Sequence, residues 1–330
     1  MELKGKTLAI TGIGGFIGLR MAERAREIGM EIQGLDFDPR VLEQVRESGF
    51  KCFSGDVTNP EDCEQLCRGA DIVFNTAATL DAKAPIEVAR RINVRGAVNM
   101  AEAARKAGAR YFVQLSSVMV YGYTYPPYVT EDGPLRGENN PYCQTKIEGE
   151  RALMGLHQPG EFDVIIIRPG DVYGPRSQPW VLGPATMMSQ GKFVAVKNNT
   201  GIMNHLHVDN LIDGIFLALE QDAGGETFNL TDGAETTFDD YFAYLEKFVG
   251  KKSTRLPAGV LRTLFGAIDF FCRLRNKPSP VDASILSIFM RPHPYSIEKA
   301  RAQLGYEPRI CLEDGMQEVK QHLKAIGLVP

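Results

Sequence analysis

The sequence predicts an α/β protein with a doubly wound parallel sheet and a smaller C-terminal lobe. Six short apolar runs of strand character alternate with amphipathic segments through the first half of the chain. The helical segments begin and end at clear signals, and the alternation breaks down after about residue 175. Apolar strands joined by helical crossovers form parallel sheets that helices cover on both faces, which defines the class.

The strands are expected at residues 7–11, 31–36, 51–56, 71–75, 111–116 and 163–168. Between them, Asp38-Pro39 and Asn59-Pro60 each place a capping side chain before a proline at the first helical position. Later prolines then interrupt the pattern, at Pro175, Pro179 and Pro184. We expect residues 1–175 to form a nucleotide-binding domain. Residues 176–330 should mainly form a substrate-binding lobe, with a segment at about 205–235 that returns to pack on the first domain.

Composition and charge exclude several classes of protein. A chain of 330 residues that is 44% hydrophobic and 24% charged can bury a large core. Its formal net charge of −4 argues against a nucleic-acid partner, which needs a basic face. The first residues lack the features of a secretion signal, which predicts a cytoplasmic protein. Six cysteines without zinc-site spacing or disulfide density predict reduced thiols and no metal site.

The turn after the first expected strand has the spacing of a pyrophosphate-binding loop, TGIGGFIG. Gly12, Gly15 and Gly18 allow a tight strand-to-helix turn, close approach of backbone N–H groups to a pyrophosphate, and tight packing of the helix on the sheet. Phe16 and Ile17 lie between them, at the positive end of the helix. The turn therefore predicts a bound dinucleotide.

Asp36 ends the second expected strand, where an acidic residue binds the ribose of a dinucleotide. A carboxylate at this position accepts hydrogen bonds from both ribose hydroxyls and repels a 2′-phosphate. NAD is therefore favoured as the cofactor over NADP, although Arg40 close by weakens the preference.

Two more strand ends provide candidate cofactor contacts. Asp56 and Val57 follow the third strand and are candidates for the adenine edge, with a turn-forming carboxylate as the alternative for Asp56. Ala77 and Ala78 follow the fourth strand, and their small side chains would let the cofactor lie close to the backbone.

The segment PYCQTK contains the residues that we expect to carry the chemistry. Tyr142 and Lys146 are four residues apart on an expected helix and therefore lie on the same face. A free tyrosine titrates near pH ~10, and a neighbouring cation lowers its pKa toward the range useful for acid–base catalysis. We expect Lys146 to do this for Tyr142. Isolated Tyr-x-x-x-Lys pairs are usually only a solvated helix face, so a third partner is needed.

The third partner is expected in LSSVMVYG, just after the fifth strand. Open parallel sheets bind their ligands at the carboxyl ends of the strands, so Ser117 can reach a carbonyl or alcohol oxygen there. A serine that satisfies a backbone group at the strand end is the more common alternative.

Together, TGIGGFIG, GDV, NTAA, NVRGAVN, SSVMVYG, YCQTK and RPGDVYGP resemble the extended short-chain dehydrogenases/reductases in order and spacing, over about residues 7–310. This resemblance implies a Rossmann fold, an NAD-dependent activity and a homodimer. It also implies that Tyr142 is the catalytic acid/base, that Lys146 is its partner and a ribose ligand, and that Ser117 completes the triad. It places Asn93, Pro169 and Gly170 next to the cofactor.

Within this superfamily the distal motifs resemble the 3β-hydroxysteroid dehydrogenase-like branch, through HVDN, ETFNLTDG and YSIEKARAQLGYEP. Dehydratases carry an acidic pair after the triad serine, whereas this chain has Val118 and Met119, which cannot exchange a proton. Sugar-nucleotide epimerases typically have asparagine where Asp171 stands, and an aspartate would repel a diphosphate. Arg291 and Arg301 nevertheless remain as candidate phosphate contacts.

We therefore expect an NAD-dependent oxidoreductase that interconverts a secondary alcohol and a ketone on an apolar small molecule, steroid-like or terpenoid. The alternatives are a nucleotide-sugar 4-epimerase and a non-catalytic NAD(H)-binding protein. His205 and His207 are interpreted as polar residues at the edge of the core and not as metal ligands.

Residues 256–274 have the periodicity of a helix with one broad apolar face, formed by Val260, Leu261, Leu264, Phe265, Ile268 and Phe271. Three roles fit this pattern. The helix could roof an apolar substrate, pack as an ordinary core helix, or contact a membrane peripherally, the last being the least expected.

Overall fold

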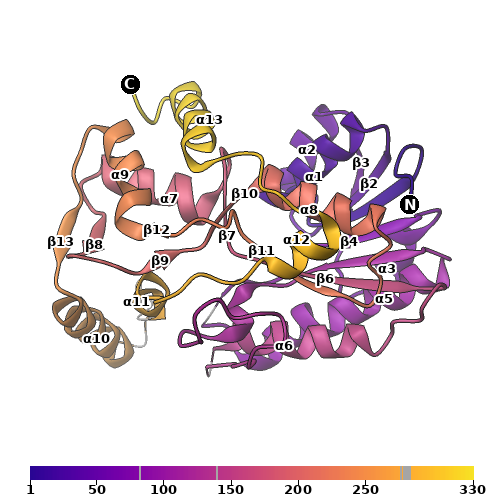
Figure 1. Cartoon of the computed structure of the whole chain (residues 1–330), viewed down its shortest axis with the longest axis horizontal. Coiled ribbons are helices and arrows are strands. Elements are labelled where there is room, and N and C mark those ends of the chain that lie inside the picture. The colour runs from indigo at the N-terminus through magenta and orange to yellow at the C-terminus, as the bar shows by residue number, and fades with distance from the viewer. Residues whose placement is uncertain (82, 139, 276, 278–283) are drawn as a thin grey trace.

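The structure is a computed structural model and describes residues 1–81, 83–138, 140–275, 277 and 284–330. Its centre is a parallel sheet in the strand order β11-β6-β5-β4-β1-β2-β3 (Figure 1). The predicted doubly wound sheet is confirmed, and each of the six expected strands is present. The strands are β1 (Thr7–Thr11), β2 (Glu31–Asp36), β3 (Lys51–Ser54), β4 (Ile72–Asn75), β5 (Tyr111–Leu115), β6 (Asp163–Pro169) and β11 (Thr227–Leu230).

Helices cover both faces of this sheet. Successive strand residues point to opposite faces, so Tyr111 and Val113 of β5 join one apolar core while Phe112 joins the other. One face is covered by α1 (Phe16–Glu27), α2 (Pro39–Glu47), α8 (Val208–Glu220) and α12 (Glu298–Leu304). The other face is covered by α3 (Pro60–Cys67), α5 (Ala97–Lys106) and α6 (Pro141–Met154), with α4 (Ile86–Arg90) and the π-helix η1 (Arg91–Gly96) leading into α5.

Local signals account for where these helices begin. The Asp38 side chain accepts a hydrogen bond from the backbone N–H of Arg40, and the Asn59 side chain accepts one from the N–H of Glu61. Both caps precede a proline in the first turn, as the sequence predicts. The π-helix carries no such signal and is not predicted from the sequence.

The second lobe has its own aromatic core, in which Phe193, Phe238, Tyr241, Phe242 and Met316 are buried. It contains η3 (Gln178–Leu182), α7 (Gly183–Ser189), β8 (Val194–Val196), β9 (Ile202–Met203), β12 (Thr236–Thr237), α9 (Phe238–Val249), β13 (Thr254–Leu256), α10 (Ala258–Leu274), α11 (Ser284–Phe289) and α13 (Leu312–Ala325). Figure 1 shows this lobe beside the one that contains the seven-stranded sheet. Among the residues described, no helix is long and apolar enough to cross a membrane.

Two segments that follow residue 175 lie on the first lobe. Strand β11 pairs with β6, with Phe228 opposite Ile167, and α8 packs against α1. Between the lobes, β7 (Asp171–Tyr173) pairs with β10 (His205–His207). Both histidines of β10 are buried, and His205 Nδ1 lies 2.8 Å from Asp232 Oδ2. The chain therefore crosses between the lobes more than once, so their relative position is held by several segments.

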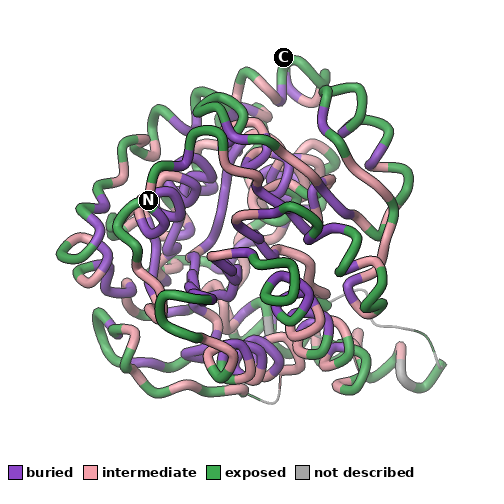
Figure 2. The backbone as a smooth tube through the Cα atoms, turned by 90° about the vertical axis from the view of Figure 1, so that its right-hand side faces the viewer, coloured by how far each residue is buried: buried purple, intermediate pink, exposed green. Residues whose placement is uncertain are grey.

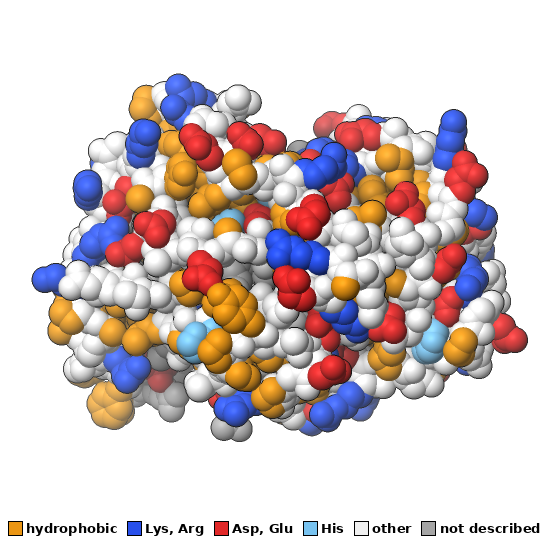
Figure 3. Space-filling model, viewed as in Figure 1, with side chains coloured by type: hydrophobic (Ala, Val, Ile, Leu, Met, Phe, Trp, Pro, Cys, Tyr) orange, Lys and Arg blue, Asp and Glu red, His pale blue; other side chains and the backbone are white. Residues whose placement is uncertain are grey.

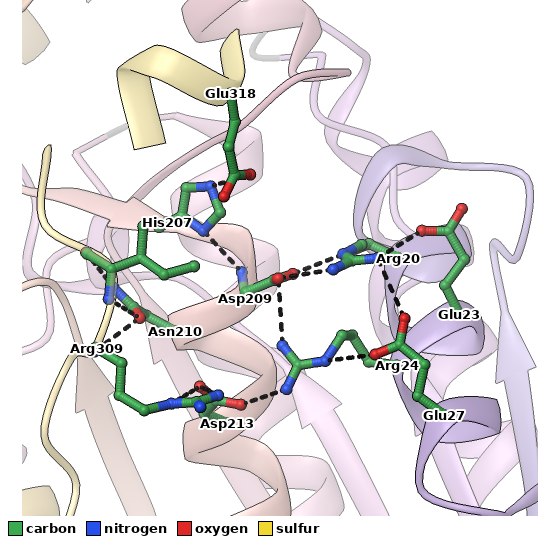
Figure 4. A network of polar contacts seen from close by, with 11 residues as sticks. Arg20, Glu23, Arg24, Glu27, His207, Asp209, Asn210, Asp213, Arg309 and Glu318 are labelled. Atoms are coloured by element: carbon green, nitrogen blue, oxygen red, sulfur yellow. Dashed lines mark hydrogen bonds and ion pairs between the residues drawn. The ribbon is translucent and has the colours of Figure 1, made fainter. Parts of the chain in front are cut away.

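An ion network joins α1 to α8 on the side of the molecule shown in Figure 4. Arg20 bonds both oxygens of Asp209, from Nε at 2.6 Å and from a terminal nitrogen at 2.7 Å. Arg24 bonds Asp213 at 2.8 Å, and Arg309 Nε bonds the same carboxylate at 2.9 Å. The network thus ties the helix after the glycine turn to α8 and to the C-terminal segment.

Candidate active site

Buried hydrogen bonds fix the carboxyl ends of three central strands. The Thr11 hydroxyl donates to Asn75 Oδ1 at 2.6 Å, and Asn75 Nδ2 donates to Gln114 Oε1 at 2.8 Å. The backbone N–H groups of Thr76 and Ala77 both donate to the Thr11 hydroxyl at 3.1 Å. The loops that leave β1, β4 and β5 therefore start from positions that cannot shift independently.

The glycine turn has the shape that the sequence predicts, and close contacts explain each glycine. Gly12 has a positive φ of 68°, and a Cβ there would lie 2.7 Å from Thr76 Oγ1. A Cβ on Gly15 would lie 3.1 Å, and one on Gly18 2.2 Å, from the carbonyl oxygen of Gly12. Gly15 is the N-cap residue of α1, and no side chain accepts a hydrogen bond there. The N-terminal amides of the helix can therefore donate to a ligand.

A hollow of about 440 Å³ lies over the carboxyl ends of β1, β2 and β3. It is lined by Gly12, Gly15, Asp36, Asp56, Val57, Ala77 and Ala78, all of which are predicted cofactor contacts. Sequence reasoning missed several other lining residues, among them Leu35, Phe37, Thr58, Arg91 and Ile92. Leu35 and Phe37 flank Asp36, which is the signal that could have found them. Arg91 and Ile92 belong to the unpredicted π-helix.

Asp36 is held in place by the backbone around it. Its two carboxylate oxygens accept hydrogen bonds from Gly14 N and Asp38 N, each at 3.0 Å. Arg40, which the sequence suggests could soften the preference for NAD, bonds Asp38 from Nε at 2.9 Å and from a terminal nitrogen at 2.6 Å. Asp56 accepts a hydrogen bond from Thr58 N at 2.8 Å, so it forms a turn as well as lining the hollow.

A second hollow of about 350 Å³ continues from the first. The two share Gly15, Thr76 and Ala78, so they form one crevice along the carboxyl edge of the sheet. The second hollow is lined by Phe16, Ile17, Gly18, Ser117, Tyr142, Lys146, Pro169 and Gly170 from the predicted set. Sequence reasoning missed Leu80, Val172, Gln178, Pro179 and Trp180, because nothing in their local pattern marks them as lining a site.

Helix α6 and the end of β5 bring Ser117, Tyr142 and Lys146 together. Tyr142 lies in the first turn of α6, and Asn140 caps that turn by accepting a hydrogen bond from Tyr142 N at 2.9 Å. Ser117 begins the 3-10 helix η2 (Val118–Tyr121), and its hydroxyl also accepts a hydrogen bond from Met119 N at 3.1 Å. The ammonium of Lys146 lies 5.6 Å from the centre of the Tyr142 ring.

Burial is the main influence on the pKa of Tyr142 in this structure, and the effect expected from Lys146 stays a prediction. Burial raises the pKa of Tyr142 to about 12 and outweighs the opposing hydrogen bond with Ser117. The Lys146 ammonium instead donates to the carbonyl oxygen of Leu115 at 2.8 Å. Burial lowers the pKa of Lys146 itself to about 8. Burial disfavours the charged form of both groups, because both lose solvent together.

A buried ion pair lies one turn beyond Lys146 on the same helix. Glu150 accepts hydrogen bonds from Arg168 Nε at 3.0 Å and from a terminal nitrogen at 2.7 Å, and the Ser116 hydroxyl also donates to it. Arg168 lies on β6, so this pair fastens α6 to the sheet. The negative charge of Glu150 also favours the charged form of Lys146, against the effect of burial.

Asn93 is the predicted cofactor residue that lines neither hollow. Its Oδ1 accepts a hydrogen bond from Thr79 N at 2.8 Å, and its Nδ2 donates to Thr145 Oγ1 at 2.9 Å. The amide is therefore occupied in fastening the loop after β4 to α6. Asn93 thus fixes the position of both segments, and its place next to the cofactor stays a prediction.

Arg291 is fully buried and forms an ion pair with Asp171 at the start of β7. Its Nε also donates to the carbonyl oxygen of Ile288 at 3.1 Å. Neither Arg291 nor Arg301 lines the crevice, and Arg301 bonds Glu298 at 2.8 Å. The two candidate phosphate contacts from the sequence are thus both engaged with carboxylates of the protein.

The sequence profile of the NAD dependent epimerase/dehydratase family matches residues 8–231. The chain therefore belongs to this family, and its cofactor is NAD. The match includes the glycine turn, the three residues of the candidate triad and strand β11. It confirms the expectation of an NAD-dependent enzyme with the extended short-chain dehydrogenase/reductase pattern.

Two relatives resemble the chain along nearly its whole length. Sterol-4-alpha-carboxylate 3-dehydrogenase, decarboxylating, from Mus musculus is 27% identical over 346 residues, with 96% of this chain and 91% of the relative covered. A 3-beta-hydroxysteroid dehydrogenase from Mycolicibacterium neoaurum is 27% identical over 337 residues, with 94% and 89% covered. Both agree with the branch that the distal motifs resemble.

Among solved structures, the UDP-glucuronic acid 4-epimerase from Bacillus cereus in complex with UDP-glucuronic acid and NAD has the same fold. The TM-score is 0.76 at 22% sequence identity, with 97% of this chain and 99% of that chain covered. At this identity the likeness establishes the fold and does not distinguish an epimerase from a dehydrogenase.

Proposed function

We propose that this protein is an NAD-dependent oxidoreductase that interconverts a secondary alcohol and a ketone on an apolar, sterol-like or terpenoid small molecule. The observation that carries the proposal is the second hollow, which is lined by Ser117, Tyr142 and Lys146 together with apolar side chains. The similarity to the sterol and 3-beta-hydroxysteroid dehydrogenases supports the same substrate class.

The roles of the residues follow from their positions. When bound, NADH would supply the hydride for reduction and NAD+ would accept it in oxidation. Tyr142 donates a proton to the ketone oxygen during reduction, and its raised pKa keeps the phenol protonated at neutral pH for this step. In oxidation the phenolate form of Tyr142 accepts the proton of the alcohol. The Ser117 hydroxyl hydrogen-bonds the same oxygen. The N-terminal amides of α1 would bind the pyrophosphate, and the carboxylate of Asp36 would bind the ribose.

The other residues that line this hollow support an apolar substrate. Leu80, Val172, Pro179 and Trp180 contribute apolar surface, and Gln178 contributes one amide. A diphosphate would need cationic partners in the same hollow, and Arg291 is fully buried in its pair with Asp171. These contacts favour an alcohol or ketone on a hydrophobic skeleton over a sugar nucleotide.

A substrate panel tests the proposal. Hydroxysteroids, other apolar secondary alcohols and UDP-sugars would be incubated with the protein and NAD while NADH absorbance is recorded. We expect NADH to form with members of the first two groups. Redox-neutral conversion of a UDP-sugar by protein that retains NAD would overturn the proposal in favour of an epimerase. NADH binding without turnover of any substrate would favour a binding protein.

Tyr142→Phe should reduce turnover of the substrate so identified by ~10²–10⁴-fold, because the proton donor is lost, while the Kd for NADH stays nearly unchanged. Tyr128→Phe is the matched control, since that phenol is 58% exposed and lies outside the crevice. Near-normal turnover by Tyr142→Phe would contradict the role of this residue.

A further inference from the structure

Helix α10 carries an apolar stripe on its solvent side. Val260, Leu264, Ala267, Phe271 and Leu274 recur at intervals of four and three residues, so they lie along one face of the helix. Leu264 is 44% exposed, Phe271 59% and Leu274 66%. Figure 1 shows α10 at the end of the molecule farthest from the large sheet, and Figure 3 shows hydrophobic side chains gathered in the same region.

The stripe is separate from the face by which α10 packs. Leu261 is buried against Val196 and Leu286, and Phe265 joins the same small core. These residues lie about 100° around the helix from the exposed stripe, since each residue advances a helix by that angle. Figure 2 shows that exposed and intermediate residues predominate along α10. The stripe is therefore not required for folding of the described lobe, yet it exposes large apolar side chains to water.

Basic residues are frequent in and beside α10. Residues 251–277 contain seven Lys and Arg but one Asp, in a chain whose net charge is −4. One of the seven, Arg255, is paired with Asp239 and Glu246, which leaves six basic residues against one acidic residue. Arg275 and Lys277 line the same shallow hollow as Leu264 and Phe271. Cations at the margin of an exposed apolar face are complementary to a surface that is apolar inside and anionic outside.

We propose that α10 binds peripherally to the surface of an anionic phospholipid bilayer, with the stripe among the acyl chains and the flanking Lys and Arg at the phosphates. The charge decides between this partner and a second copy of the chain. Two copies joined through α10 about a twofold axis would place one basic segment against another, which like-charge repulsion opposes. An anionic bilayer attracts the same segment.

Binding in this way would hold the protein at the lipid surface through its second lobe. None of the described side chains of α10 lines the crevice that contains Tyr142, so the proposed contact leaves the crevice open. The inference does not depend on the identity of the substrate, and its test needs neither substrate nor turnover.

Vesicle flotation with the full chain tests this inference. The probes are vesicles of phosphatidylcholine alone and of phosphatidylcholine with phosphatidylglycerol at about 30%. We expect at least about tenfold stronger partitioning onto the anionic vesicles, and a marked loss of binding at high salt. Absence of binding to the anionic vesicles would overturn the proposal.

Paired variants locate the contact. Leu264→Glu combined with Phe271→Glu, and separately Arg275→Glu combined with Lys277→Glu, should each weaken partitioning by about tenfold or more. Met187→Glu is the control, since Met187 is a 45% exposed apolar residue on α7. Circular dichroism and NADH binding would verify that each variant is folded. Equal binding by wild type and both paired variants would overturn the proposal, as would a dimer that the Leu264/Phe271 variant converts to monomer in sedimentation.

Discussion

A backbone contact explains why position 18 requires glycine. A Cβ on Gly18 would lie 2.2 Å from the carbonyl oxygen of Gly12, so the turn would have to open to accept it. We predict that Gly18→Ala raises the Kd for NADH by at least about tenfold, because the turn presents its amides to the pyrophosphate only in its tight form. Fluorescence titration of NADH measures this directly.

Gly266→Ala is the matched control for that substitution. Gly266 lies inside α10, and apart from its chain neighbours and the backbone of its own helix no described atom lies within 4 Å of a Cβ built there. This variant should bind NADH as the wild type does and gain about 0.5–1 kcal/mol in the free energy of unfolding, because alanine is the better helix former. An unaltered Kd in Gly18→Ala would show that the turn tolerates a methyl group.

The pKa of Lys146 predicts a pH dependence of cofactor binding. Burial lowers this pKa to about 8, so the ammonium loses its proton as the pH rises through that value. A charged donor binds ribose hydroxyls more strongly than a neutral amine. The Kd for NADH should therefore increase several-fold between pH ~7 and pH ~9. Lys146→Gln should bind more weakly at the lower pH and lose this dependence; a flat profile in the wild type would rule out the charged lysine as a ribose partner.

At the scale of single residues, the sequence predicts positions whose role follows from local geometry. Gly12 and Asp36 fall into this class, because a turn and the end of a strand suffice to place them. Asn93 does not belong to this class, because its amide forms hydrogen bonds with Thr79 and Thr145, which are distant in sequence. The pKa of Tyr142 is also beyond sequence reasoning, since burial is a property of the folded chain.

The start of α6 connects helix stability to the chemistry of the crevice. Asn140 accepts hydrogen bonds from Tyr142 N at 2.9 Å and Cys143 N at 3.4 Å, and Tyr142 lies in the turn that this cap holds. Asn140→Ala should lower the free energy of unfolding by about 1 kcal/mol and also reduce kcat, because the first turn frays. Urea unfolding and steady-state kinetics measure the two effects.

Asn140→Asp provides the comparison, since aspartate caps a helix as well as asparagine does. It should restore both the stability and most of the activity. A loss of stability in Asn140→Ala without any change in kcat would show that the position of Tyr142 is fixed by tertiary packing and not by the cap.

At the scale of elements, the sequence predicts those that carry their own signals. Helices α2 and α3 begin where their caps and prolines indicate, and the six strands agree with their apolar runs. The pairing of β11 with β6 is a long-range contact, so its sequence alone does not specify it. Periodicity identifies α10 as a helix with apolar residues, but it cannot tell which of them will pack and which will face solvent.

At the scale of the whole molecule, the two-lobed arrangement depends on contacts between segments far apart in the chain. The ion network of Figure 4 is the clearest polar example, because it links α1, α8 and the C-terminal segment. Sequence composition shows only that 37 basic and 41 acidic residues exist, and not which of them pair. The crevice lies beside the helix that this network holds, so the network contributes to the position of the glycine turn.

Asp209 is the residue of this network whose loss should cost the most. Its side chain is 11% exposed and bonds Arg20 through both oxygens. Burial, the largest single influence, raises the pKa of Asp209, but the hydrogen bonds from Arg20 and the charges of Arg20 and Arg24 together outweigh burial, so the net shift is downward. Asp209→Asn should therefore lower the free energy of unfolding by about 3 kcal/mol at neutral pH, since two guanidinium groups lose a partner.

The lowered pKa of Asp209 determines how the stability lost in Asp209→Asn depends on pH. A carboxyl whose pKa is depressed in the folded state adds stability above its unfolded pKa, and this contribution disappears as the pH falls through the folded value. The difference in unfolding free energy between wild type and Asp209→Asn should therefore shrink as the pH is lowered from about 5 to about 3. Glu64→Gln, at an exposed pair with Lys106, should leave Tm unchanged throughout. A difference that stays constant with pH would mean that Asp209 acts through packing and not through its charge.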